Sequence, residues 1–254
     1  MTGSITFQRD ARAAIAQVVL ANPGKLNAID ITMWRELREL FERLQAEPLD
    51  TAPRVVIVRG AGGQFASGGD IHEFAQFRFD EASLRDFHEH TVAPALHAML
   101  ACDIPLLAQI DGACIGGGFE IAACCDIRVC AESSRFGAPI ARLGFPMAPG
   151  ELALLARIAS GPVLREMLLE ARLFDAQRAW QLGLVHAVVA DDQLAALALQ
   201  RATAMAALSP QAARKALKRL SDMGGGGSWA GRWRARERSR WVGCVEGLNP
   251  VECA

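Results

Sequence analysis

Residues 104–125 read IPLLAQIDGACIGGGFEIAACC, and this stretch decides the fold. An apolar run, short enough for a buried strand, leads through a glycine-rich turn into residues that favour a helix. Residues 54–71, RVVIVRGAGGQFASGGDI, repeat the order of strand and glycine-rich turn. The repetition predicts an α/β architecture in which two junctions of the same kind recur.

The flanking sequence extends this α/β pattern in both directions. Residues 5–20 predict a hairpin of short strands, and apolar spacings of three and four predict a helix capped by Asp30 or Thr32 that ends before Pro48. Gly161 and Gly183 are expected just beyond helix ends. Further elements are expected as helices over 83–100, 117–124, 151–159, 162–170 and 175–182, strands over 127–130 and 184–189, and helices thereafter.

The chain is divided into a core over 1–200 and a helical C-terminal region over 201–254, with an atypical tail rich in arginine and tryptophan after Gly224. Its 254 residues, 51% hydrophobic and 22% charged, exclude a disordered chain or a coiled coil. With 27 basic and 28 acidic residues, the net charge of −1 argues against nucleic acid or an anionic membrane as partner. No apolar stretch approaches the roughly 18 residues of a membrane span, so a soluble, cytoplasmic protein is expected.

Cysteine and histidine spacing gives no sign of a metal site. The seven cysteines contain no C-x-x-C pair, and the five histidines form no H-E-x-x-H motif. An odd number of cysteines, mostly in the apolar middle of the chain, is typical of reduced core thiols. We therefore expect neither disulfides nor a bound metal.

The residues of the two glycine-rich turns do not match the motifs of two common functions of such turns. Neither turn matches the phosphate-binding patterns G-x-x-x-x-G-K-[ST] or G-x-G-x-x-G. The serine hydrolase motif G-x-S-x-G requires glycine where Phe65 precedes Ser67. Phosphate binding and serine hydrolysis are therefore disfavoured.

The two turns together predict an oxyanion hole. Each strand-to-helix junction offers unpaired peptide N–H groups, and glycine lets the backbone approach a ligand that a Cβ would obstruct. Glu120 follows Gly117 by three residues, and side chains on a helix lean toward its N-terminus. Its carboxylate is therefore expected above the first turn, in apolar surroundings that raise its pKa and suit it to proton transfer. The alternative is an acidic residue that merely stabilises the helix dipole.

Five ordered motifs stand out along the chain: NPGKLNA at 22–28, FASGGDIHEF at 65–74, DGACIGGGFE at 111–120, CDIR at 125–128 and RFGAP at 135–139. Together they resemble the crotonase (enoyl-CoA hydratase/isomerase) superfamily, from about Ile5 to Leu217. The resemblance implies a spiral of repeated ββα units with a helical C-terminal region, assembled as a homotrimer or a dimer of trimers. It also implies acyl-CoA thioesters as substrates, with coenzyme A as part of the substrate and no permanently bound cofactor.

The resemblance also implies roles for individual residues. The N–H groups of Gly69 and Gly117 would form the oxyanion hole, and Glu120 matches the first catalytic glutamate of the hydratases. Other positions fall where the family binds coenzyme A: Lys25, Leu26, Ala28, Ser67, Asp70 and Ile71. Lys25 is alternatively an ordinary surface lysine.

Position 140 departs from the hydratase pattern, because Ile140 stands where the second glutamate is found and cannot transfer a proton. Glu151, His72, Glu73 and His88 are candidate replacements, although a solvated or structural role also explains each. The function we expect is acyl-CoA processing of the enoyl-CoA hydratase/isomerase type. The alternatives are an acyl-CoA hydrolase or decarboxylase on the same fold, or a non-catalytic acyl-CoA-binding protein.

Overall fold

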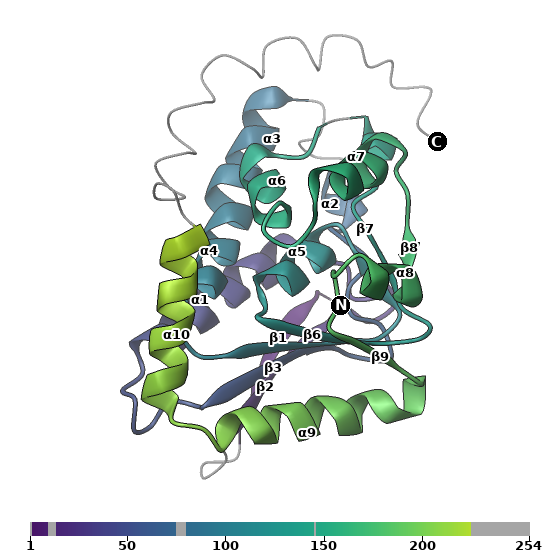
Figure 1. The fold of residues 1–254 in the computed structure, drawn as a ribbon. Coiled ribbons are helices and arrows are strands. Elements are labelled where there is room, and N and C mark those ends of the chain that lie inside the picture. The colour runs from purple at the N-terminus through teal and green to yellow at the C-terminus, as the bar shows by residue number, and fades with distance from the viewer. Residues whose placement is uncertain (1, 10–13, 75–79, 145, 225–254) are drawn as a thin grey trace.

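The computed structural model describes residues 2–9, 14–74, 80–144 and 146–224. A six-stranded sheet lies between layers of helices (Figure 1), with the strands in the order β1-β2-β3-β4-β6-β9. β1 and β2 form the expected antiparallel hairpin, whereas the other neighbouring pairs are parallel. Because β3 and β4 are parallel neighbours, the glycine-rich turns that follow them leave the sheet at the same edge. The strands are β1 (Ser4–Gln8), β2 (Ile15–Ala21), β3 (Val55–Gly60), β4 (Leu106–Ile110), β6 (Ile127–Ala131) and β9 (Ala187–Val189).

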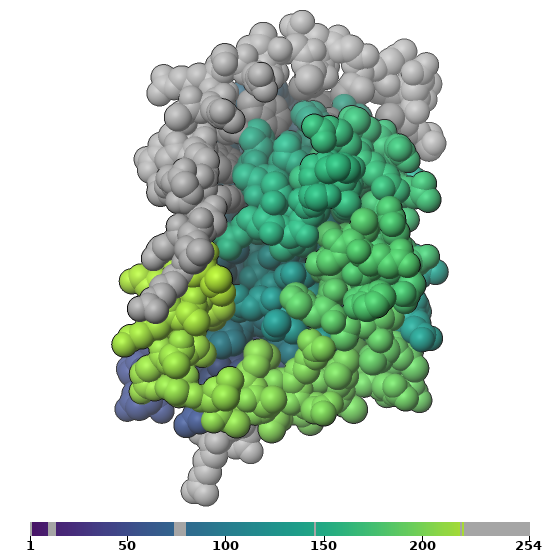
Figure 2. All heavy atoms as spheres, viewed as in Figure 1, coloured from purple at the N-terminus to yellow at the C-terminus, as the bar shows by residue number. Residues whose placement is uncertain are grey.

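Helices cover both faces of this sheet. Helix α9 packs on one face, where Ala198 and Ala202 meet Ile57 and Leu107. The larger core lies on the other face, beneath α1, α4 and α5. Helices α9 and α10 form the lower and left margins of the face seen in Figure 2. The helices are α1 (Ile31–Ala46), α2 (Ile71–Phe74), α3 (Glu81–Phe87), η1 (His88–Val92), α4 (Ala93–Ala101), α5 (Gly117–Cys124), η2 (Ile140–Leu143), α6 (Pro149–Leu155), α7 (Gly161–Leu169), α8 (Ala176–Gln181), η3 (Asp191–Gln193), α9 (Leu194–Ala206) and α10 (Pro210–Gly224).

A second, three-stranded sheet was not predicted. It has the order β5-β7-β8, formed by Ala113–Ile115, Arg135–Gly137 and Phe174–Asp175. Strands of two or three residues are too short to show an alternating apolar pattern, so only pairing with distant segments reveals them. This small sheet matters for the site because β5 leads directly into the second glycine-rich turn.

Local signals in the sequence placed α1 correctly. Asp30 caps the helix, and its side chain accepts a hydrogen bond from the Met33 N–H at 2.8 Å. The buried face carries Trp34, Leu37 and Phe41, at the predicted spacings of three and four. Trp34 is the residue of this face that reaches the candidate site.

The helix predicted over 83–100 is interrupted by a π-helical turn, η1. The Ala93 N–H donates to the carbonyl of His88, five residues back, which widens the helix at this point. Pro94 follows immediately, and proline has no N–H with which to continue an α-helix. The interruption places His88 at the start of η1.

The prediction for Gly161 was wrong, whereas Gly183 does follow the end of α8. Gly161 is the first residue of α7, and Pro162 occupies the first turn, where its missing N–H costs nothing. The same glycine signal therefore marks a helix start here, because the residue after it is proline.

Five cysteines of the described chain are buried and unbridged: Cys102, Cys114, Cys124, Cys125 and Cys130. Cys244, Cys253 and the tail after Gly224 lie outside the described residues. The expected division at residue 200 falls within α9 and stays a prediction. No helix within the described ranges is long and apolar enough to cross a membrane.

Candidate active site

Backbone hydrogen bonds hold the two glycine-rich turns side by side. The Ala66 N–H donates to the Ala113 carbonyl at 2.8 Å, and the Ile115 N–H donates to the Ala66 carbonyl at 3.0 Å. These bonds attach the turn after β3 to β5, which leads into the turn before α5. Two segments far apart in the sequence therefore meet at one place.

The contact between the turns requires glycine at position 118. A Cβ on Gly118 would lie 2.5 Å from the Ala66 carbonyl oxygen and 2.8 Å from the Ala66 Cβ. Backbone atoms cannot move aside as the end of a long side chain can, so any side chain here would push the turns apart. The third glycine of the run thus permits their close approach.

Gly69 and Gly117 carry unpaired N–H groups at this junction. Gly117 begins α5, where the first N–H groups have no partner within the helix. Neither N–H donates to any residue in the part of the chain that the structure describes. Both glycines line one cavity. Two glycines with unpaired N–H groups therefore lie at the wall of one cavity.

The structure adds a second reason for glycine at 117, besides the expected close approach of a ligand. A Cβ on Gly117 would lie 2.9 Å from Cζ2 of Trp34 and 3.4 Å from its Cη2. A side chain at this position would therefore clash with the Trp34 ring. Trp34, which the sequence did not single out, packs against the α5 N-terminus and lines the cavity.

Glu120 lies on the first turn of α5 and also lines the cavity. Its side chain is buried, and no described residue forms a hydrogen bond with its carboxyl group. Burial, and secondarily the negative charge of Glu151, raises the pKa of Glu120 well above the ordinary 4.5. A raised pKa brings the proton equilibrium of a carboxyl group closer to neutral pH, which favours general acid–base catalysis.

The cavity has a volume of about 250 Å³ and a mainly apolar wall. Phe87, Val92, Ile115 and Met147 supply part of this wall, while the glycine turns and Glu120 supply the polar groups. Apolar surroundings exclude water and strengthen the electrostatic interactions inside. The arrangement can therefore hold a carbonyl group with an apolar substituent and move a proton beside it.

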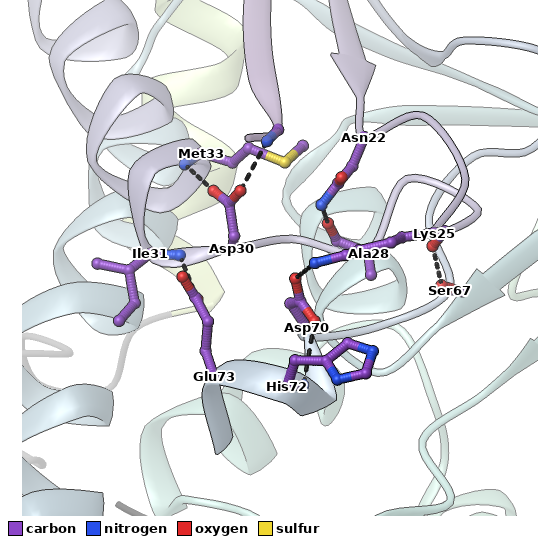
Figure 3. A network of polar contacts seen from close by, with 11 residues as sticks. Asn22, Lys25, Ala28, Asp30, Ile31, Met33, Ser67, Asp70, His72 and Glu73 are labelled. Carbon is purple, nitrogen blue, oxygen red and sulfur yellow. Dashed lines mark hydrogen bonds and ion pairs between the residues drawn. The ribbon is translucent and has the colours of Figure 1, made fainter. Parts of the chain in front are cut away.

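Three residues predicted to bind coenzyme A form a polar network beside the cavity (Figure 3). Lys25 Nζ contacts Asp70 Oδ2 at 2.5 Å, and the Ser67 hydroxyl donates to the Lys25 carbonyl at 3.1 Å. Burial alone would raise the pKa of Asp70, but hydrogen bonds from Lys25 Nζ and the His72 N–H hold it below its usual value. The Lys25 ammonium group is thus held at one place by a buried carboxylate.

Leu26, Ala28 and Ile71, the other predicted binding residues, lie in the same region. Leu26 and Ile71 are exposed apolar residues, at 58% and 63%, whereas Ala28 is buried. Ser67 and Ile71 also line the cavity. The structure thus gathers all six residues at one side of the cavity, and their contact with coenzyme A stays a prediction.

Asn27, to which the sequence assigned no role, holds this segment in place. Its Nδ2 donates to the carbonyls of Ala61 and Gln64 at 2.8 and 2.7 Å, and its Oδ1 accepts from the Asn22 N–H at 3.1 Å. Its φ of 55° lies in the left-handed region, which asparagine tolerates better than most residues. In the sequence, the presence of an asparagine within a turn could have indicated this role.

The structure separates the four candidate replacements for an acidic residue at 140. His72 and Glu73 lie on α2 and are not among the described residues lining the cavity. Glu73 instead accepts a hydrogen bond from the backbone at the start of α1 (Figure 3). His88 and Glu151 both line the cavity, together with Ile140.

His88 and Glu151 also contact each other, which the sequence did not predict. The distance from His88 Nδ1 to Glu151 Oε1 is 2.5 Å, although the residues are 63 positions apart. Both side chains are buried, at 7% and 4% exposure. In the sequence, the only local indication of a role for Glu151 was the occurrence of an acidic residue within an apolar run.

Comparisons with known proteins agree with this arrangement. A family model described as enoyl-CoA hydratase/isomerase matches residues 10–223. The mevalonyl-coenzyme A hydratase of Aspergillus fumigatus is 32% identical over 208 residues, which cover 81% of this chain and 74% of that protein. The 2,3-dehydroadipyl-CoA hydratase of Escherichia coli is 34% identical over 210 residues, covering 81% and 79%.

Solved structures share the fold. The crystal structure of an enoyl-CoA hydratase/carnithine racemase from Magnetospirillum magneticum matches with a TM-score of 0.82 and 38% identity, covering 88% of this chain and 82% of that one. These similarities confirm the crotonase fold and the hydratase/isomerase type of enzyme that the motifs imply. The chain therefore belongs to the enoyl-CoA hydratase/isomerase family of the crotonase superfamily.

Proposed function

We propose that this hydratase/isomerase-type enzyme binds an acyl-CoA thioester with the carbonyl oxygen between the N–H groups of Gly69 and Gly117. Glu120 then moves a proton at the carbon next to the carbonyl. The observation that carries this proposal is a buried carboxyl group in the same cavity as two unpaired N–H donors.

The two N–H groups stabilise the negative charge that develops on the thioester oxygen. Hydrogen bonds to an oxyanion strengthen as the charge forms, and one such donor contributes about 2.7–4 kcal/mol to the transition state. The N-terminus of α5 adds a partial positive charge at Gly117. The resulting enolate needs a nearby group to give or take its proton, and that group is Glu120.

The substrate brings coenzyme A with it, so these steps need no other cofactor. Lys25, held by Asp70 near the cavity residues Ser67 and Ile71, is expected to meet the charged part of that carrier. The relatives named above include hydratases of two different CoA thioesters. The proposal therefore specifies the thioester and leaves the acyl group open, and a homotrimer or a dimer of trimers remains the predicted assembly.

The proposal is tested by proton exchange on a saturated thioester. We expect the purified protein in heavy water to introduce deuterium at the α carbon of butyryl-CoA, because this exchange needs only the oxyanion hole and Glu120. Mass spectrometry detects the mass increase. A parallel panel of enoyl-CoA thioesters reports hydration or double-bond migration.

The outcomes separate the proposal from its alternatives. Binding of the thioesters without exchange or conversion would indicate a non-catalytic binding protein. Release of free coenzyme A, or of carbon dioxide from a carboxylated acyl-CoA, without α exchange would indicate a hydrolase or a decarboxylase. Either result contradicts the assignment of Glu120.

Ile140→Glu tests whether position 140 limits hydration. Ile140 lines the cavity with Glu120 and Glu151, so a third carboxyl group there would be buried among like charges and driven toward its neutral form. We expect a modest rise in crotonyl-CoA hydration and a lower unfolding midpoint, since burying a polar group costs several kcal/mol. The absorbance of the enoyl thioester measures the rate of hydration, and thermal unfolding measures the midpoint. A large rise in hydration would show that the groups already present do not supply a second proton-transfer residue.

A further inference from the structure

His88 is a buried histidine on the cavity wall that neither the oxyanion hole nor Glu120 explains. We propose that His88, oriented by Glu151, is a second catalytic residue and activates the water molecule that adds to the β carbon of an enoyl-CoA. This inference rests on the proposed function, because it needs the thioester bound at Gly69 and Gly117. It assigns to His88 the proton transfer for which the Ile140 side chain has no suitable group.

The contact with Glu151 orients the His88 ring. The proposed step uses the tautomer in which the Nδ1–H of His88 donates to Glu151 Oε1 across the 2.5 Å contact, since a carboxylate only accepts hydrogen bonds. A neutral ring with its proton on Nδ1 has a free lone pair on Nε2. The buried carboxylate also stabilises the positive charge that appears when Nε2 takes up a proton.

The other ring nitrogen has no partner in the protein. His88 Nε2 is buried, and no hydrogen bond to it is found among the described residues. A buried polar atom without a partner costs free energy, so a pair that served only to stabilise the fold would be expected to satisfy both nitrogens. His88 lines the cavity, and the proposal requires its unpartnered Nε2 to meet a water molecule bound there.

The fold holds this pair close to Glu120. His88 starts the π-helical turn η1, and such turns are frequent at functional sites. Glu151 lies in the first turn of α6, which packs against α5, the helix of Glu120. The charge of Glu151 contributes to the raised pKa of Glu120, as expected for neighbouring carboxyl groups. The cavity thus holds an acid and a base on different elements.

The proposed step balances as the addition of one water molecule to an enoyl-CoA. His88 Nε2 takes a proton from water as the water oxygen forms a bond to the β carbon. The π electrons of the double bond move toward the carbonyl oxygen, where the N–H groups of Gly69 and Gly117 stabilise the enolate. Protonated Glu120 then gives its proton to the α carbon, and transfer of a proton from His88 to Glu120 through solvent restores both groups.

His88→Gln tests the step because glutamine retains polarity but cannot act as a base. We expect crotonyl-CoA hydration to fall by about 10²–10⁴-fold, the usual contribution of a general base. Deuterium exchange into butyryl-CoA, which requires no water activation, should persist. Unchanged hydration would overturn the proposal. Equal loss of both activities would also overturn it, because His88 would then be maintaining the structure of the site.

Glu151→Gln tests the positioning role. We expect kcat for hydration to fall while KM for crotonyl-CoA stays unchanged, because the variant disturbs the base and not thioester binding. The double variant His88→Gln/Glu151→Gln should lose much less hydration than the product of the two single losses, since Glu151 acts mainly through His88. Independent, multiplying losses would contradict that role.

His90→Gln is the matched control, because His90 lies on the same π-helical turn and also contacts a carboxylate, Asp86, at 2.9 Å. Its side chain is exposed, so both activities should be unchanged. A wild-type protein that exchanges α protons but hydrates no enoyl-CoA would overturn the role of His88 and leave the proposed function standing. Absence of both exchange and conversion in the wild type would instead contradict the proposed function itself.

Discussion

Glu120→Gln is expected to lower α-proton exchange and enoyl-CoA conversion by about 10²–10⁴-fold, with the fold and thioester binding retained. Glutamine has nearly the same shape but cannot give or take the proton. The loss corresponds to about 3–5 kcal/mol of transition-state stabilisation. Initial rates measure the loss, and titration of butyryl-CoA checks binding. Unchanged turnover in the folded variant would show that another group moves the proton.

Thermal unfolding at several pH values supplies the control for this variant. The raised pKa means that folded Glu120 keeps its proton at pH values where the unfolded chain has lost it. Stability must therefore fall as the pH rises from about 4.5 toward the raised pKa, and glutamine at 120 removes this fall. We expect the Tm of Glu120→Gln to exceed that of the unmodified protein by a margin that grows as the pH rises above about 4.5. A constant margin would argue against a raised pKa.

Gly117→Ala is expected to lower the same activities by about 10²-fold, the effect of moving a catalytic group by about 1 Å. The new Cβ would lie 2.9 Å from Trp34 Cζ2, so the first turn of α5 must shift. That shift moves the N–H of residue 117 and the carboxyl group of Glu120 together. We expect kcat to fall more than thioester affinity, measured by rates and by equilibrium titration.

Trp34→Phe distinguishes this displacement from other causes. Phenylalanine lacks the outer ring atoms that the new Cβ approaches, so Gly117→Ala should be less harmful in the Trp34→Phe background than in the unmodified protein. Gly161→Ala is the matched control, because Gly161 also begins a helix and its Cβ would approach only the flexible end of Arg165, at 3.2 Å. A loss at position 117 that is equal in both backgrounds would exclude the contact with Trp34 as the cause.

Much of the main sheet and of α1 was predictable because the signals are local. Apolar spacing along α1 and the cap at Asp30 depend on residues within a few positions of one another. The glycines and Glu120 of the candidate site were predictable for the same reason, since one run of sequence carries Gly117 and Glu120. Their catalytic roles remain predictions for the variants above.

Other features escaped sequence reasoning for different reasons. Strands β5, β7 and β8 contain too few residues to show a period and exist only through their pairing. The widened turn at His88 lies just before Pro94, within what reads as one continuous helix. The start of α7 at Gly161 was misread because glycine is compatible with either end of a helix.

The sequence by itself determined the family, the repeated junctions of strand and glycine-rich turn, and the presence of one carboxyl group beside them. Only the tertiary structure decided that His88 meets Glu151 across 63 positions, that Trp34 explains glycine at 117, and that Lys25 is held by Asp70. Periodicity and capping act within a few residues, whereas the neighbours of a buried side chain depend on how the whole chain packs. The tertiary structure also decides the pKa of Glu120, because this pKa depends on burial and on the charge of Glu151, which lies on a different helix.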